Sequence, residues 1–388
     1  MKFGIKTKKI LTKTVFVLLS AINKMVRHNP KKVLFYINTD FRENNKFLYD
    51  YMLKYGYNDS YRIICHSSDY IKYKKNSNPN VSFVGVVGCI LHFFTAGKVF
   101  YCIGHLPIDA SSDQKILQMW HGTPLKDVDK GSLLTHPVGH KFYTKVLAPS
   151  QHFIPMYERF FNVDKSKVVI GGMPRNETLY EPSPQYDFGE YKKLIVWAPT
   201  FRKSSQLQYT DSNLSSESLI PILKKTDLID FDIFLKTLGV KIIVKLHPFQ
   251  DLSGWDEYNK LDSLILLSHQ EFTKRDMDLY KLLKQSNALI TDYSSIYFDY
   301  LLLNRPIGFT EDDLKSYEEN RGFVMSNPDD YKPGFRIRTK SELIQFCCAI
   351  VSEQDDYVEE RIRVNNLAND YRDGNFCKRI LDIMDIKR

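Results

Sequence analysis

Residues 288–310 read ALITDYSSIYFDYLLLNRPIGFT, and this stretch decides the fold class. Two short apolar runs, at 288–291 and 307–310, have the length and composition of buried strands. We interpret the segment between them, 295–303, as a helix. A strand, a helix and a second strand in so short a span predict a parallel sheet covered by helices, which is an α/β fold.

The same alternation extends in both directions from this unit. Upstream of it, the pattern predicts strands at 194–198, 241–246 and 264–268 and helices at 218–237 and 278–286. An earlier series predicts strands at 33–37, 62–65, 81–86, 98–103, 116–120 and 146–149, with helices at 45–55, 87–96 and 151–161. The segment Glu181-Pro182-Ser183-Pro184 separates the two series. We therefore expect Rossmann-like domains at 33–185 and 186–388, the second ending in a helical tail over 341–387.

Composition and charge fit this organisation. The 388 residues are 43% hydrophobic and 26% charged, which predicts about two packed domains and excludes disordered and collagen-like chains. The net charge is +8, but residues 1–32 contain nine Lys and Arg residues and no acid. Subtracting this +9 from +8 leaves −1 for residues 33–388, so no nucleic-acid-binding surface is expected there.

The basic segment 1–32 has a short apolar centre. Its uncharged run, 14–23, is about half of the ~20 apolar residues that a membrane-spanning helix needs. A secretory signal would have a small-residue cleavage site where Lys24 and Arg27 stand. We predict a basic amphipathic helix on an anionic membrane surface, with lipid contacts from Phe16, Val17, Leu18, Leu19 and Ile22. The alternative is a helix that packs on the chain's own core and leaves its lysines in solvent.

Several other chemistries lack their sequence signatures. The six cysteines show no C-x-x-C spacing, which is typical of buried thiols in a reducing compartment. His136 and His140 have the spacing of a metal-binding pair, but no further ligand accompanies them. Asp127-Val128-Asp129 lies among lysines and is interpreted as a solvated charge cluster. The chain has no P-loop and no nucleophile elbow, so we expect neither P-loop phosphoryl transfer nor α/β-hydrolase chemistry, and no cofactor or metal.

Polar and turn-forming residues stand out at the ends of strands in five places. Open α/β sheets bind ligands outside the carboxyl ends of their strands, so these positions are the candidates for a site. Each motif alone is also ordinary turn chemistry. The five motifs are Trp120-His121-Gly122-Thr123-Pro124, Gly171-Gly172-Met173-Pro174-Arg175-Asn176, Ala198-Pro199-Thr200, Lys245-Leu246-His247-Pro248 and Thr291-Asp292-Tyr293-Ser294-Ser295.

The last of these motifs, with the helix after it, is suited to a nucleotide. Ser294 and Ser295 stand where a strand ends and a helix begins, and the exposed N–H groups of that first turn favour a phosphate. The alternative is an ordinary serine N-cap. Asp299, one turn further, could bind a ribose hydroxyl pair, or it could lie on a solvated face.

Basic and histidine side chains supply candidate catalytic groups. His247 and Lys245 could balance charge on a pyrophosphate leaving group, although a strand-end histidine with a structural role is an equal alternative. Arg175 could bind a phosphate oxygen. His121, in a fixed turn, could accept the proton of an attacking hydroxyl as a general base.

Taken together, these motifs resemble the CDP-glycerol glycerophosphotransferase family, the teichoic-acid primases and polymerases. The resemblance covers roughly residues 33–350 and keeps the family's order. It rests on Trp120–Lys126, Ala148-Pro149-Ser150, Gly172–Asn176, Trp197–Arg202, Lys245–Pro248 and Thr291–Ser295 with Asp299.

The resemblance implies a fold, a site and a reaction. It implies a GT-B fold, with two Rossmann-like domains facing a central cleft, an N-terminal acceptor domain and CDP-glycerol held mainly by the C-terminal half. His121 then looks like the base and His247 like the partner of the pyrophosphate. The implied substrate-binding residues are Trp120, Gly122, Thr123, Pro124, Arg175, Pro199, Thr200, Lys245, Leu246, Ser294, Ser295 and Asp299.

In the implied reaction, an acceptor hydroxyl attacks the β-phosphorus of CDP-glycerol and CMP leaves. The implied acceptor is an undecaprenyl-diphosphate-linked saccharide, and the implied place is the cytoplasmic face of the cell membrane, as a peripheral protein. The 388-residue length favours a primase, which adds one unit. A polymerase or a ribitol-phosphate transferase of the same family, a GT-B enzyme that uses a nucleotide sugar, and a membrane-bound binding protein without catalysis are the alternatives.

Overall fold

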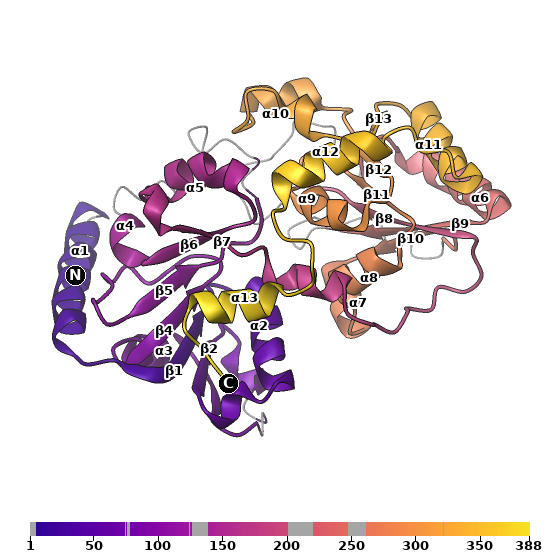
Figure 1. Ribbon diagram of the computed structural model, residues 1–388. Helices are drawn as coiled ribbons and strands as arrows, with labels where there is room; N and C mark the ends of the chain where they lie inside the picture. Colours follow the sequence, from indigo (N-terminus) through magenta and orange to yellow (C-terminus); the bar gives the residue numbers. More distant parts are fainter. Residues whose placement is uncertain are drawn as a thin grey trace. The chain divides into compact units, whose positions relative to one another are not determined.

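The computed structural model describes residues 5–73, 75, 78–123, 125, 139–200, 220–246, 261–320 and 322–388 (Figure 1). The chain divides into two compact units. The first comprises Met1–Gly122, Leu134–Glu177 and Asp373–Arg388, and the second comprises Thr123–Leu133 and Thr178–Arg372.

The first unit is built on a seven-stranded parallel sheet in the order β3-β2-β1-β4-β5-β6-β7. Its strands are β1 (Asn29–Tyr36), β2 (Arg62–His66), β3 (Val81–Val84), β4 (Ala96–Tyr101), β5 (Lys115–Gln118), β6 (Lys145–Ala148) and β7 (Val168–Ile170). The central strands are buried because β-branched and aromatic residues fill them, and Val33 of β1 pairs with Ile63 on one side and Lys98 on the other. The helices of this unit are α1 (Ile5–Met25), α2 (Glu43–Lys54), α3 (Val86–Phe93), α4 (Gly139–Phe142), α5 (Ile154–Phe161) and α13 (Phe376–Ile383).

The C-terminal helix α13 belongs to the first unit. Its apolar stripe, Phe376, Cys377, Ile380 and Leu381, is buried. Phe376 lies directly over Gly172, whose φ of +75° and missing Cβ leave room for the ring. The Cys377 N–H donates to Glu177 at 2.6 Å. The structure thus groups 373–388 with the first unit, whereas the sequence analysis grouped the whole tail with the second domain, because contacts across some 200 residues of chain are not visible in local periodicity.

The second unit repeats the plan with a six-stranded parallel sheet in the order β10-β9-β8-β11-β12-β13. Its strands are β8 (Lys193–Ala198), β9 (Val240–Lys245), β10 (Leu264–Leu267), β11 (Ala288–Thr291), β12 (Ile307–Thr310) and β13 (Phe335–Ile337). Its helices are α6 (Leu228–Leu238), α7 (His269–Lys274), α8 (Leu279–Gln285), α9 (Ile296–Tyr300), α10 (Leu314–Asn320), α11 (Lys340–Ser352) and α12 (Val358–Ala368). One core cluster joins the sheet to α6 and α11 through residues such as Trp197, Phe231 and Phe346.

The predicted α/β class with two parallel sheets is confirmed, and three details of the elements differ. Among the described residues of the helix expected at 218–237, helical backbone begins at Lys225, first as a 3₁₀ turn and then as α6, because Pro221 disfavours helical backbone at residue 220 and Ile222 has a left-handed φ of 71°. Five of the strands and α-helices that the structure describes were not among those predicted, namely the strands β7 and β13 and the helices α4, α7 and α10. The tail is three helices, and the first of them ends at Glu353 in the left-handed conformation, with φ of 58°.

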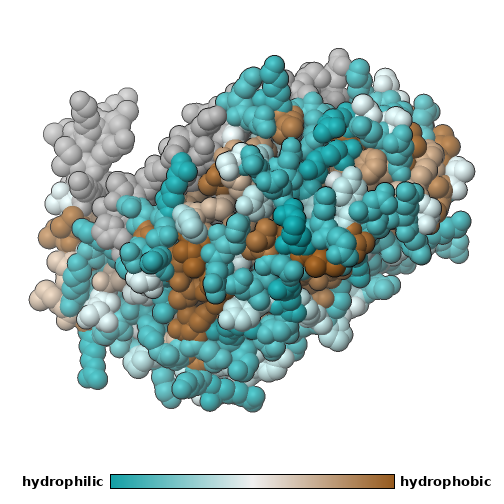
Figure 2. Space-filling view, turned by 45° about the horizontal axis from the view of Figure 1, so that its top comes forward, coloured by the Kyte–Doolittle hydropathy of each residue, from teal (hydrophilic) through white to brown (hydrophobic). Residues whose placement is uncertain are grey.

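The helix α1 contacts the first unit through polar side chains. Asn23 is fully buried and donates to the Asp109 carbonyl at 2.9 Å and to Gln114 Oε1 at 2.7 Å. Ser20 Oγ accepts from the Asp109 N–H at 3.0 Å. The outward face is apolar, since Leu18, Ile22 and Met25 are 60%, 49% and 86% exposed. Apolar colours accordingly gather at the left edge of Figure 2, where α1 lies. The helix thus packs on the first unit through its polar side chains and the half-buried Phe16 and Leu19, as the alternative expects, and it exposes other apolar residues; its binding to a membrane stays a prediction.

Candidate functional site

Both sheets have a topological switch point, and in the second sheet Thr200 and Ser294 follow the two strands that flank it. In the first sheet β1 lies between β2 and β4, and in the second β8 lies between β9 and β11. In each sheet the chain continues from the central strand, β1 or β8, to the strands on one side of it and then crosses to the strands on the other side. In open α/β sheets, this arrangement creates a crevice outside the carboxyl ends of the two central strands, where ligands bind.

In the second unit, Asp292 joins two of the predicted motifs. Its carboxylate accepts from the Thr200 N–H at 2.9 Å and from the Thr200 hydroxyl at 2.8 Å, and also from the Tyr293 N–H at 2.7 Å. Asp292 is buried, so these bonds fix the turn after β8 to the turn after β11. Pro199 is buried in the first of these turns. No role was predicted for Asp292, because its role depends on a hydrogen bond to Thr200, 92 positions away in the sequence.

The remaining residues of the 291–299 motif lie at the start of α9. Ser294 and Ser295 are half-buried. The Ser294 hydroxyl accepts from the Ile296 N–H at 3.5 Å, as the N-cap alternative expects, whereas the Ser295 side chain makes no capping bond. Asp299 is buried and accepts from the Tyr280 hydroxyl at 2.7 Å, which excludes the solvated-face alternative. Phosphate binding by the two serines and ribose binding by Asp299 stay predictions.

The Lys245–Pro248 motif is described only in part. Lys245 is half-buried, donates to the Leu246 carbonyl at 3.1 Å and lies 5.7 Å from the centre of the Phe272 ring. Leu246 is buried. His247 and Pro124 lie outside the described residues, so their predicted roles have no structural test.

A buried ion cluster lies at the carboxyl end of β12 in the second unit. Glu311 accepts from Lys332 at 2.9 Å, from Arg336 at 3.3 Å and from Arg338 at 3.1 Å. The Glu311 and Lys332 side chains are both almost fully buried. Sequence reasoning did not single out this cluster, which joins the loop after β12 to β13 and its flanks.

In the first unit, Trp120 has a strained backbone that hydrogen bonds hold in place. Its φ is +56°, a left-handed value that is uncommon for a large side chain. Its N–H donates to Gln118 Oε1 at 3.0 Å, and its carbonyl accepts from Asn44 at 2.8 Å and from the Cys102 thiol at 3.2 Å. Burial raises the pKa of Cys102 to about 12, so the thiol keeps the proton that it donates.

The strained turn presents His121 to solvent. The imidazole is exposed and lies against the Trp120 indole, with ring centres 4.2 Å apart. The His121 carbonyl accepts from Arg175 Nη1 at 2.6 Å, and the same nitrogen lies 3.3 Å from a Glu43 carboxylate oxygen. Arg175 is buried, so its guanidinium holds the backbone of His121, while its predicted contact with phosphate stays a prediction. Gly122 and Thr123 are buried beside this turn.

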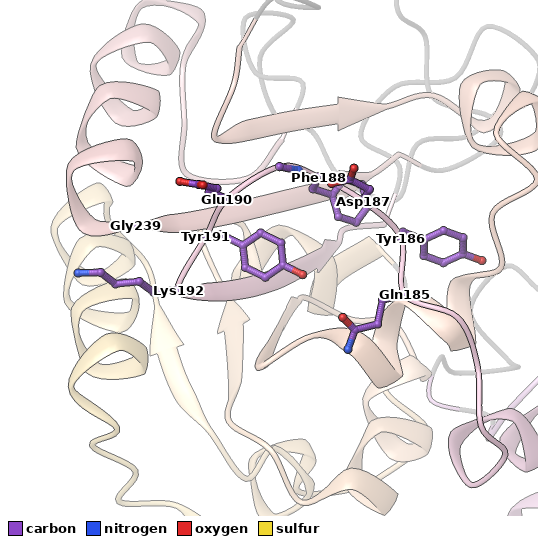
Figure 3. Close-up of a pocket in the computed structure, with 9 residues that line it drawn as sticks. Gln185, Tyr186, Asp187, Phe188, Glu190, Tyr191, Lys192 and Gly239 are labelled. Carbon is purple, nitrogen blue, oxygen red and sulfur yellow. Dashed lines mark hydrogen bonds between the residues drawn. The ribbon is translucent and has the colours of Figure 1, made fainter.

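Two pockets lined by described residues differ in character. One, of about 790 Å³, is lined by Gln185–Lys192 and Gly239 in the second unit (Figure 3). It lies at the amino end of β8, the opposite end from Thr200, and no predicted site residue lines it. The other, of about 270 Å³, lies in the first unit and includes Trp120 in its lining.

In the described part of the chain, no group of three or more His, Cys, Asp or Glu side chains is placed to hold a metal ion. Asp127, Asp129 and His136 lie outside that part, as does the side chain of His140. No helix among the described residues has the length and apolarity to cross a membrane. Five of the six cysteines are buried, and all six are free thiols.

Two parallel α/β units, each with a topological switch point, define a protein of the GT-B class. A solved structure of the wall teichoic acid polymerase TagF supports this class, with a TM-score of 0.71 over 99% of both chains at 22% sequence identity. The chain belongs to the CDP-glycerol:poly(glycerophosphate) glycerophosphotransferase family, whose model matches residues 18–384. The resemblance found in the sequence is therefore confirmed.

Curated relatives carry several names within this family. The chain is 26% identical over 366 residues to a teichoic acid poly(ribitol-phosphate) polymerase of Bacillus spizizenii, covering 88% of this chain and 54% of the relative. It is 26% identical over 295 residues to a teichoic acid glycerol-phosphate transferase of Staphylococcus aureus, covering 68% and 69%. It is 26% identical over 297 residues to a teichoic acid glycerol-phosphate primase of Bacillus subtilis, covering 70% and 68%. The chain thus spans about half of the first relative and about two thirds of the others.

Proposed function

We propose that this protein transfers glycerol phosphate from CDP-glycerol to a hydroxyl of an undecaprenyl-diphosphate-linked saccharide, as the primase of a wall teichoic acid or a related cell-surface polymer. The observation that carries the proposal is the match of the glycerophosphotransferase family to residues 18–384, which span both parallel sheets. Ribitol-phosphate transfer is the second candidate, because the relative that matches 88% of the chain is a poly(ribitol-phosphate) polymerase.

In the proposed reaction, His121 takes the proton of the acceptor hydroxyl. The hydroxyl oxygen then forms a bond to the β-phosphorus of CDP-glycerol, the bond from that phosphorus to the bridging oxygen breaks, and CMP leaves with the electron pair. The exposed imidazole of His121 suits this role, and the bonds from Arg175 and Asn44 keep its backbone from relaxing.

The second unit supplies the proposed donor site. The turn that contains Thr200 and the turn that contains Ser294 and Ser295 are tied together by Asp292, so N–H and hydroxyl donors gather at one switch point. Lys245 and His247 are proposed to balance the charge that develops on the departing phosphate. Asp299 is proposed to bind the ribose.

We further propose that α1 attaches the protein peripherally to the cytoplasmic face of the cell membrane. A helix that directs polar side chains inward and Leu18, Ile22 and Met25 outward has the arrangement of an interfacial helix. The nine basic residues of segment 1–32 favour an anionic lipid surface. The lipid part of the acceptor would lie in that surface.

Mass spectrometry of the product tests the proposed reaction. The protein is incubated with CDP-glycerol or CDP-ribitol and a synthetic lipid-diphosphate disaccharide, and the number and mass of the added units are read directly. One added glycerol phosphate is the expected product, and a His121→Ala variant should form it at least a hundredfold more slowly. A product with one or more ribitol phosphates would support the second candidate. Release of UDP from a UDP-sugar, without release of CMP from either CDP-glycerol or CDP-ribitol, would overturn both.

A further inference from the structure

The 270 Å³ pocket of the first unit lies at the switch point of its own sheet. Tyr36 ends β1, Gly104 and His105 follow β4, and Gln118 ends β5, and all four line the pocket. The pocket therefore occupies the place where an open parallel sheet binds its ligand. Its volume is just below the range of about 300–1,000 Å³ for drug-sized ligands, so it has room for about one sugar ring.

The inner wall of this pocket is aromatic. The Trp120 ring lies 5.0 Å from Phe160 and 5.4 Å from Phe161, and the Tyr143 ring lies 6.0 Å from Phe161. Trp120, Tyr143 and Phe161 are buried and Phe160 is half-buried. Flat aromatic walls of this kind stack on the apolar C–H face of a sugar ring.

Polar groups accompany this wall. The Tyr143 hydroxyl and His105 Nδ1 are 2.7 Å apart, and Gln118 donates to the Gly104 carbonyl at 3.2 Å. These bonds fix the orientation of the side chains that line the pocket, and the side chain of Asn38 is exposed at its edge. Hydroxyl, imidazole and amide groups can bind the hydroxyls of a sugar.

The charge of the lining selects among possible occupants. The ten residues that the structure places around the pocket include no Asp, Glu, Lys or Arg. A phosphate-rich chain such as poly(glycerol phosphate) is expected to need cationic partners, whereas an uncharged hydroxylated ring is not. The lining therefore favours a saccharide over an anionic polymer.

We propose that this pocket binds a saccharide ring of the acceptor and so sets the acceptor specificity of the enzyme. The inference rests on the proposed transfer reaction and specifies where that acceptor binds. Trp120 forms part of the pocket wall, and the same indole contacts the His121 ring at 4.2 Å. His121 does not line the pocket itself, but through this contact with Trp120 its ring lies one side chain away from a sugar bound there.

Phe160→Ala tests the pocket, with Phe94→Ala as the matched control. Both phenylalanines are half-buried residues of the first unit, and Phe94 is not part of the pocket lining. With a short-chain diphosphate-linked disaccharide as acceptor, we expect the KM for the acceptor to rise about tenfold in Phe160→Ala. The KM for CDP-glycerol should stay unchanged, and Phe94→Ala should behave like the wild type. An unchanged acceptor KM, or an equal rise with oligo(glycerol phosphate) as acceptor, overturns the proposal.

A binding measurement separates failure of the pocket from failure of the reaction. Calorimetry with the free disaccharide, without donor, lipid or diphosphate, requires no turnover. Binding to the wild type and to Phe94→Ala that is lost in Phe160→Ala supports the pocket even if no CMP is ever released. Absence of binding to the wild type overturns the pocket while leaving the reaction to its own test. If Phe160→Ala does not fold, Phe160→Leu replaces it, because leucine keeps the apolar volume and removes the ring.

Discussion

Replacing Leu18 and Ile22 by glutamine tests the outward apolar face of α1 without changing the charge of the protein. The two residues are 60% and 49% exposed, four positions apart on the same helix. Full burial of a leucine or isoleucine side chain contributes about 1.5–3 kcal/mol, so the exposed portions of the two together correspond to about 2–3 kcal/mol of membrane binding. The double variant should therefore bind vesicles about 30- to 150-fold more weakly.

The assay is co-sedimentation with vesicles that contain an anionic phospholipid. The matched control is Ile229→Gln with Ile233→Gln, two residues of α6 that are each 59% exposed and also four positions apart. We expect the control to bind vesicles like the wild type. Since both pairs are largely exposed, neither double variant should lower the melting temperature by more than a few degrees.

Two results would refute the reasoning about α1. One is unchanged vesicle binding of the Leu18→Gln, Ile22→Gln variant, which would leave the lysines as a solvated face. The other is equal weakening in the α6 control, which would mean that any exposed apolar pair acts in the same way. Point substitutions are preferable to deletion of residues 1–28. A deletion would remove Asn23 and His28, and so the hydrogen bonds that satisfy Gln114 and Asp113.

Three further predictions concern stability. Asp292→Asn should lower the unfolding free energy by about 1–3 kcal/mol in urea titration and raise the KM for CDP-glycerol. The reason is that the amide cannot accept every hydrogen bond that the carboxylate accepts. An unchanged KM with lowered stability would limit Asp292 to a structural role. Glu311→Gln should cost about 3–5 kcal/mol in the same titration, since the buried Lys332 loses its buried counter-charge and keeps the exposed Asp329 at 3.5 Å. Glu353→Gln at an exposed ion pair should cost less than about 1 kcal/mol, and similar losses for the two variants would contradict the role of burial. Desolvation acts to raise the pKa of Asp113, but hydrogen bonds from the His28 N–H, from Ser111 and from the His28 ring lower it from 3.8 to about 2. Because this pKa is lower in the folded state, the melting-temperature difference between wild type and Asp113→Asn should be constant above about pH 5 and shrink as the pH falls from 4 toward 2; a difference that persists at pH 2 would exclude this ionisation.

The strands were predictable because burial on both faces of a parallel sheet gives short, continuous apolar runs. Two of the expected strands, 288–291 and 307–310, have the observed bounds. The helix expected at 218–237 was predicted too long at its amino end. The prediction followed the apolar residues of this segment and gave too little weight to Pro221, which disfavours helical backbone. The strand Phe335–Ile337 is three residues long with a charged centre, and it is defined by pairing with β12.

Only those residues of the candidate site that stand at the ends of strands could be predicted from the sequence. His121, Thr200, Ser294 and Lys245 stand after strands, and the rule on carboxyl ends identifies them from the sequence. The residues that hold them are different, because they act across the fold. Asn44 reaches the Arg175 N–H 131 positions away, and Asp292 reaches Thr200 92 positions away. No local pattern encodes such contacts, so the supporting hydrogen bonds became visible only in three dimensions.

The place of α13 has a consequence for the synthesis of the chain. Most of the first unit is translated before the second, but the helix that covers Gly172 and binds Glu177 is translated after all of Thr178–Arg372. At about 5–20 residues per second, these 195 intervening residues take about 10 to 40 s to make. Throughout that interval the surface meant for Phe376 and Ile380 is uncovered on the ribosome-bound chain, and a ribosome that stalls within the second unit leaves an aggregation-prone nascent chain for chaperones to shield.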